Sequence, residues 1–309
     1  MVSGCAKLMS DCGCVFPGVH EWGLWNTLPR RTGSGILMKI EILGSAASEG
    51  MPALFCECRI CREAAARGGK NIRTRTSLMI GEKHKVDLPP DTFLHSLRRG
   101  KPFSKVEHLF VTHSHCDHFY PEELRLRAEP FAFVESPRQL HIYGTETIGE
   151  LAEDALGSLL ADALVFHPVE LFHSFTAGEI EVLPVKASHK SDELCLNYVF
   201  TSRGKGFLQA FDTGWYEDDT WSALAGLMLD AAIIECTAGK LDEPPTAHLG
   251  IQPLIKMKER LVRDCALRPD AIVIATHFSH IGGLLHEELE RALSPAGILV
   301  AYDGMTLEI

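Results

Sequence analysis

Several features are missing from this sequence of 309 residues, and their absence excludes whole classes of protein. No run of about 18 uncharged apolar residues occurs, so the sequence predicts no membrane span. Positive charge is in deficit: 30 Lys and Arg against 41 Asp and Glu give a net charge of −11. This charge disfavours binding to extended nucleic acid, which depends on Lys and Arg to neutralise phosphates. A small anionic substrate remains compatible with it.

The first 37 residues also lack an apolar segment typical of a secretory signal, because Ser10, Asp11, Gly13 and Gly18 interrupt it. A cytoplasmic location is therefore the expectation, and in that reducing compartment the ten cysteines are expected to stay free or bind metal. We interpret residues 1–37 as an N-terminal extension, either disordered or an ordered arm that covers its tryptophans. A single domain is expected over residues 38–309.

Apolar residues make up 46% of the chain, enough for a sizeable core, and their spacing alternates between strand and helix patterns. The first strand is expected at residues 39–43. Further strands are predicted at residues 106–112, 139–143, 180–185, 196–201, 206–211, 231–235, 271–276 and 297–301. Helices are predicted at residues 145–160, 249–265 and 286–293, where apolar residues recur every three or four positions. This alternation predicts an α/β fold.

The strongest local signal is the segment His113-Ser114-His115-Cys116-Asp117-His118, which follows the strand predicted at residues 106–112. Three imidazoles and a carboxylate leave the end of one strand together. Nitrogen and oxygen ligands of this kind suit Zn²⁺ or a similar divalent ion. We assign Cys116, inside the segment, no role.

Three more ligand-type residues follow other predicted strands, namely His189, Asp212 and His277. Because loops after strand ends converge on one rim of a sheet, we expect these side chains to join the His113–His118 segment. A site for two metal ions is the hypothesis that uses all of them.

In this order the ligands resemble the metallo-β-lactamase superfamily of hydrolases, over residues 38–309. The resemblance implies an αββα sandwich, with two mixed sheets flanked by helices. It also implies two divalent ions, Zn or Mn, at the active site. Carried over by position, the first ion is held by His113, His115 and His189, the second by Asp117, His118 and His277, and Asp212 bridges the two.

Within the superfamily, Cys56-Glu57-Cys58-Arg59-Ile60-Cys61 resembles the CxCxxC of the phosphoribosyl cyclic phosphodiesterase branch. That branch also has Thr-His-x-x-His, here residues 276–280, and a closing Asp-Gly-Met, here residues 303–305. Three thiolates and His280 would complete a closed tetrahedral shell for one structural Zn. Cys236 is an alternative fourth ligand, although its place in a strand favours the core. The branch has Cys-Ser-His where this chain has Cys236-Thr237-Ala238.

The candidate catalytic residues are His248 and Asp117. His248 precedes an amphipathic helix and matches the extra active-site histidine of the branch, so it is expected to act on the phosphoryl group or protonate the leaving oxygen. Asp87 sits where members of the resembled family often carry an Asp after a strand, and the resemblance implies that it orients His113 or His115 from behind.

The sequence therefore predicts a phosphodiesterase acting on a small cyclic or nucleotide-like phosphodiester, through a water that two metal ions activate to hydroxide. Three different functions stay open beside it: an RNA 3′-end processing nuclease, a hydrolase of lactones, thioesters or β-lactams, and a non-enzymatic metal-bearing carrier of the same fold. A small phosphodiester is the expected partner, without extended nucleic acid or membrane, and a homodimer is an option for the assembly.

Overall fold

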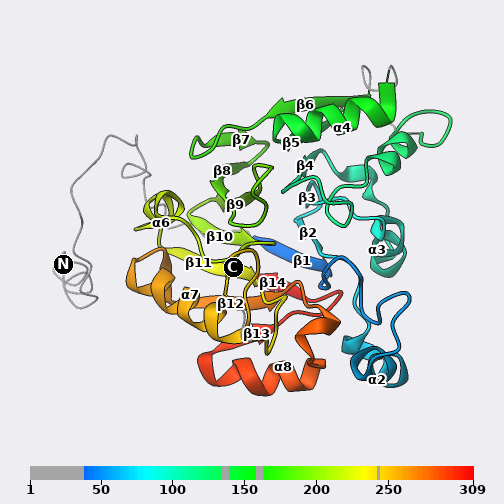
Figure 1. The fold of residues 1–309 in the computed structure, drawn as a ribbon. Coiled ribbons are helices and arrows are strands. Elements are labelled where there is room, and N and C mark those ends of the chain that lie inside the picture. Colours follow the sequence, from blue (N-terminus) through cyan, green and yellow to red (C-terminus); the bar gives the residue numbers. More distant parts are fainter. Residues whose placement is uncertain (1–37, 134–138, 158–162, 242–243) are drawn as a thin grey trace.

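A computed structural model describes residues 38–133, 139–157, 163–241 and 244–309; the predicted extension at residues 1–37 lies outside these ranges. Two mixed sheets dominate the described chain (Figure 1). The first has the order β14 (Thr306–Glu308), β1 (Lys39–Gly44), β2 (Ser77–Ile80), β3 (His84–Val86), β4 (His108–Phe110), β5 (Leu140–Gly144) and β6 (Leu164–Pro168). The second has the order β13 (Ile298–Val300), β12 (Leu267–Thr276), β11 (Leu229–Glu235), β10 (Lys205–Ala210), β9 (Leu196–Ser202), β8 (Ile180–Lys186) and β7 (Phe175–Ala177).

Helices cover the outer sides of the two sheets (Figure 1). The first sheet is flanked by α3 (Thr92–Arg99) and α4 (Glu146–Leu156), and the second by α6 (Asp218–Leu224), α7 (Ile251–Arg263) and α8 (His286–Leu293). A further helix, α2 (Arg59–Arg67), follows the cysteine segment. Short 3-10 helices lie at Gly69–Asn71, Phe103–Lys105, Pro121–Arg127, His280–Gly282 and Ser294–Ala296. The predicted αββα sandwich is confirmed. No helix in the described ranges is long and apolar enough to cross a bilayer.

Strand β4 shows how alternation builds the layers, because successive side chains of a strand point to opposite faces. Phe110 joins the core between the sheets, where its ring centroid lies 5.0 Å from that of Tyr143 and 5.1 Å from that of Phe200. Leu109 faces the other way and packs in a separate cluster with Ile148 of α4. Burial of one such side chain contributes roughly 2 to 3 kcal/mol. The two cores fix β4, and with it the segment that begins at residue 113.

The parallel strands of the two sheets are β3 to β6 in the first and β10 to β13 in the second. Candidate ligands follow the carboxyl ends of β4, β8, β10 and β12, as the sequence predicts. Asp87, Asp212 and His277 each lie just after a strand and have positive φ angles of 60°, 41° and 55°. Such angles are unfavourable for residues with a Cβ and concentrate at functional sites.

Candidate metal centre

The first group of candidate ligands consists of His113, His115, His189 and Asp212, whose ligand atoms all lie within 4.8 Å of one another. His115 Nδ1 is 2.9 Å from His113 Nε2 and 3.2 Å from His189 Nε2. Asp212 Oδ2 is 3.3 Å from His113 Nε2 and 3.6 Å from His189 Nε2. The loops after β4, β8 and β10 thus bring together the residues that the sequence assigns to the first metal.

The second group consists of Asp117, His118, Asp212 and His277, all four buried. Asp212 Oδ2 is 3.0 Å from His118 Nε2, and Asp212 Oδ1 is 3.1 Å from His277 Nε2. Asp117 Oδ2 lies 3.3 Å from His118 Nε2 and 3.9 Å from His277 Nε2. Asp212 is therefore a member of both groups, the arrangement expected for a bridging carboxylate.

The hydrogen bonds behind the histidines fix which ring nitrogen carries the proton. His118 Nδ1 donates to Asp87 Oδ2 at 2.7 Å, and His189 Nδ1 donates to the carbonyl of Ala247 at 3.3 Å. Thr237 Oγ1 donates to the carbonyl of His277, so it accepts from His277 Nδ1 at 2.9 Å. With Nδ1 protonated, the Nε2 lone pair of each ring is left for a cation.

His113 follows the same rule through Thr112, whose Oγ1 donates to Asp87 and accepts from His113 Nδ1 at 3.0 Å. Four unprotonated Nε2 atoms then converge, and those of His118 and His277 are only 3.2 Å apart. Two lone pairs at this distance repel each other unless a proton or a metal ion lies between them. Asp212 Oδ1 is buried without a hydrogen-bond partner among the described residues. The donor set thus fits divalent metal ions.

The charges of the side chains in the two groups also favour the binding of divalent metal ions. Burial alone would lower the pKa of His118, but the carboxylates of Asp117 and Asp212 outweigh it and raise this pKa well above its ordinary value. Burial would raise the pKa of Asp212, but the neighbouring His277 and His118 hold it well below the usual range. The carboxylates therefore require positive charge at this place, which divalent cations supply at neutral pH.

Asp87 was expected to orient His113 or His115; it supports His113 by way of the Thr112 hydroxyl, and it also bonds His118, which the sequence did not indicate. Its carboxylate bonds His118 directly and reaches His113 only through Thr112, whose N–H it accepts at 2.9 Å. Asp87 has a positive φ of 60°, and its carboxylate is fully buried against His118. The sequence indicated Asp87 as a residue that supports a ligand, but not that His118 is the ring that it bonds.

His248 lies beside both metal groups, and its partner is a residue that the sequence analysis missed. Its Nδ1 donates to Glu235 Oε1 at 2.8 Å and is 3.7 Å from Asp212 Oδ1. Glu235 is fully buried at the end of β11 and also accepts the backbone N–H groups of Thr213, Thr237 and Leu249. Burial lowers the pKa of His248, but the Glu235 carboxylate raises it to about 9. One signal in the sequence could have revealed Glu235: it is a charged residue at the end of the apolar strand β11, at the same edge of the sheet as the candidate ligands.

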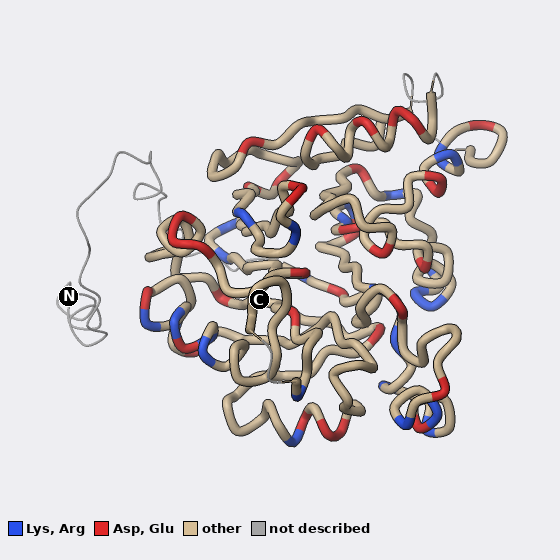
Figure 2. Tube along the Cα trace, viewed as in Figure 1, with Lys and Arg blue, Asp and Glu red and all other residues tan. Residues whose placement is uncertain are grey.

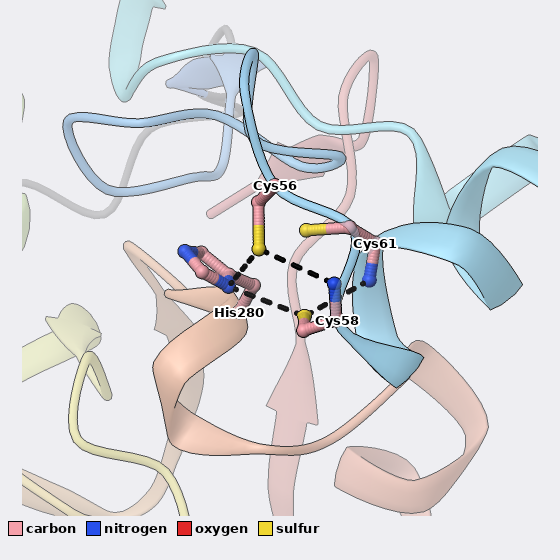
Figure 3. Close-up of side chains that lie close together, drawn as sticks. All are labelled: Cys56, Cys58, Cys61 and His280. Atoms are coloured by element: carbon pink, nitrogen blue, oxygen red, sulfur yellow. Dashed lines mark hydrogen bonds between the residues drawn. The ribbon is translucent and has the colours of Figure 1, made fainter.

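The cysteine cluster brings three cysteines from the segment at the start of α2 against His280, which follows β12 (Figure 3). The ligand atoms of Cys56, Cys58, Cys61 and His280 lie within 4.8 Å of one another, and His280 Nδ1 is 3.6 Å from Cys56 Sγ and 3.4 Å from Cys58 Sγ. Each sulfur also accepts one backbone N–H. Cys56 Sγ accepts from Cys58 N at 3.4 Å, Cys58 Sγ accepts from Cys61 N at 3.4 Å, and Cys61 Sγ accepts from Ala53 N at 3.3 Å.

These thiols differ in acidity. Burial would raise the pKa of Cys58, but the Cys61 N–H and His280 lower it to about 6, whereas burial raises the pKa of Cys61 to about 12. Three adjacent sulfurs cannot all ionise without a cation, so the set fits one zinc ion. Cys236 is fully buried in the main apolar core and is not part of this cluster.

The fold and the two groups of ligands define a class, the metal-dependent hydrolases with a metallo-β-lactamase fold. A family model, the beta-lactamase superfamily domain, matches residues 86–278, which run from the end of β3 to the loop after β12. The chain belongs to this superfamily.

Solved structures show the same fold at low identity. A diphosphatase from the PhnP family is 24% identical with a TM-score of 0.71, over 89% of this chain and 98% of that chain. Zn²⁺-bound PqqB from Methylobacterium extorquens is 18% identical with a TM-score of 0.69, over 88% and 100% of the two chains. The short form of human tRNase Z is 16% identical with a TM-score of 0.59, over 87% and 98%.

One curated protein also matches, the octanoyltransferase of Porphyromonas gingivalis (strain ATCC BAA-308 / W83), which is 35% identical over 85 residues. The match covers 26% of this chain and spans only 16% of that protein.

Proposed function

We propose that the protein is a phosphodiesterase that hydrolyses a small cyclic or nucleotide-like phosphodiester. The observation that carries the proposal is the pair His248 and Glu235 beside the shared carboxylate of Asp212. A phosphodiester of an alcohol leaves an alkoxide, which must gain a proton as the bond to phosphorus breaks. The pair supplies that proton at the position where the two ligand groups meet.

Two divalent ions, when bound, would lower the pKa of a shared water towards 7 and provide a nucleophile without a side-chain base. The protein's own residues do the rest. Asp212 belongs to both groups and would keep them at one spacing, and the carboxylate of Asp117 would accept a hydrogen bond from the attacking water and orient it. His248 uses Nδ1 to bond Glu235, so its Nε2 is the atom that donates to the leaving oxygen.

A small substrate is favoured over RNA by the surface next to the centre. The loop that carries His189 lines a cavity of about 420 Å³, within the range of small-molecule sites. Its polar lining combines Lys186, Ser188, Lys190 and Ser191 with the carboxylates of Asp192, Glu193 and Glu217. Because the lining is mixed in charge, the cavity supports a small size for the substrate and not a particular chemistry. Figure 2 shows the positions of Lys and Arg interspersed with those of Asp and Glu along the described chain.

For a thioester hydrolase or a metal-bearing carrier, some residues of the site would have no function. A thioester leaves a thiolate, which needs little protonation, so the pair of His248 and Glu235 would have no task. A carrier protein needs no complete set of catalytic ligands, yet both groups are complete among the described residues. PqqB and tRNase Z share the fold, but at 16 to 18% identity this likeness supports no choice of substrate.

The test is a substrate panel assayed with protein loaded with Zn²⁺ or Mn²⁺. It comprises cyclic ribose and nucleoside phosphodiesters, a transfer-RNA precursor, a homoserine lactone, an acyl thioester and a β-lactam. The proposal expects the highest kcat/KM for a cyclic phosphodiester. A higher kcat/KM for any of the other classes, or no turnover of the cyclic phosphodiesters, would refute it.

A further inference from the structure

Glu193 connects two of the loops that carry the first group of ligands. Its side chain is only 5% exposed, and its Oε1 accepts the backbone N–H of Ser114 at 2.8 Å. Its Oε2 accepts two hydrogen bonds, one from Ser114 Oγ at 2.5 Å and one from Lys190 Nζ at 2.8 Å. Ser114 stands between His113 and His115, and Lys190 follows His189 directly. One carboxylate therefore bonds the chain neighbours of all three histidines in the group.

The contact matters because His115 and His189 come from different loops yet must meet at 3.2 Å. His189 is already fixed by the bond of its Nδ1 to Ala247. His115 has no corresponding hydrogen bond behind its ring among the described residues, since its Nδ1 faces the cluster. Two bonds to one residue, through the backbone N–H and the hydroxyl of Ser114, fix the orientation of the loop at that point.

The rest of the loop that carries His189 is anchored independently of Glu193. Ala187 N donates to the carbonyl of Cys195 at 2.9 Å, which closes the base of the loop. Ser188 N donates to Thr213 Oγ1 at 3.0 Å, next to Asp212. Loss of the Glu193 carboxylate should therefore release the contact with Ser114 and leave the sheets and the Asp212 turn in place.

We infer that Glu193 is a positioning residue that sets the spacing between His115 and His189, and so the affinity of the first group for its metal ion. The inference rests on the metal centre of the proposed function and adds a residue to it. Residues that orient metal ligands typically change affinity by about 10- to 100-fold when removed.

The experiment is a Co²⁺ titration of metal-free protein, with bound metal counted by mass spectrometry and each site followed by its cobalt spectrum. Glu193→Ala should weaken Co²⁺ binding at the first group by about 10- to 100-fold. Binding at the second group and at the cysteine cluster should be unchanged. Glu193→Gln keeps an oxygen that accepts from Ser114 but loses the charge that holds Lys190, so its affinity should fall between those of the wild type and Glu193→Ala.

Asp192→Asn is the matched control, because this neighbour is 79% exposed and lies 3.8 Å from Lys190. It should bind Co²⁺ as the wild type does. Unchanged affinity in Glu193→Ala, equal weakening at all three sites, or the same defect in Asp192→Asn would overturn the role of Glu193. Failure of the wild-type His/Asp groups to bind Co²⁺ would instead refute the centre itself, and the inference with it.

Discussion

Removal of the His248 imidazole separates proton donation from the rest of the site. His248→Ala leaves the Glu235 carboxylate with three backbone N–H donors, so that buried charge stays solvated and the fold should persist. The His248 side chain is 34% exposed, so its truncation opens no closed cavity. Metal content and thermal stability should therefore stay close to the wild-type values.

The expected loss is in the chemical step and depends on the leaving group. A positioned acid contributes roughly 10²- to 10⁴-fold, or about 3 to 5 kcal/mol of barrier. The variant should lose this factor in kcat for a phosphodiester that releases a sugar alkoxide. For bis-p-nitrophenyl phosphate, whose leaving phenolate needs little protonation, we expect a loss below about tenfold.

The assay measures kcat for both substrates in wild type, in His248→Ala and in the control His173→Ala. His173 is exposed, its Nδ1 lies 3.4 Å from Glu170, and it belongs to neither group of ligands. The ratio of the two rates is the informative quantity. Equal slowing of both substrates would show that His248 binds or polarises rather than donates a proton, and no slowing of either would refute its role.

Three further predictions concern parts of the structure around the centre. Cys58→Ser should lose one equivalent of zinc and thermal stability, because structural zinc is coupled to folding; an unchanged zinc content would contradict the cluster. Asp87→Ala should weaken metal binding at the second group by about 10- to 100-fold while the first group changes less, since Asp87 bonds His118 directly; cobalt titration measures both. Burial lowers the pKa of Lys85 from 10.5 to about 7. The unfolded chain then binds more protons between these values, so Lys85 adds stability as pH rises from 7 to 10.5, and Lys85→Met should flatten this dependence in urea unfolding; the same slope in both proteins would contradict it.

The sequence predicted the long elements well because their apolar spacing is regular. The helix expected at residues 286–293 is α8, and the strand expected at residues 180–185 is β8, one residue longer. The helix predicted to reach residue 160 ends at Leu156, where Gly157 with a positive φ of 51° caps it. Short strands such as β2 and β3 were missed. In β3, His84 and Lys85 are buried polar residues, and burial of such side chains cannot be deduced from polarity.

The candidate ligands were predicted because each follows a recognisable strand, so their convergence follows from sheet topology. The residues that support them were harder to find. Glu193 acts through a contact with Ser114, far away in the chain, and Glu235 through His248 in the loop after its own strand, and no spacing in the sequence encodes these contacts. Asp87 bonds His118 from a left-handed backbone at a non-glycine residue, which the sequence does not show.

The most direct test of the central claim is the turnover of bis-p-nitrophenyl phosphate by Asp212→Ala, with the metal content of the same sample measured. Asp212 belongs to both ligand groups, so its loss affects both at once. A phosphodiesterase that works through this centre should lose about 3 kcal/mol or more of transition-state stabilisation. Near-normal turnover with both metal ions retained would contradict the account.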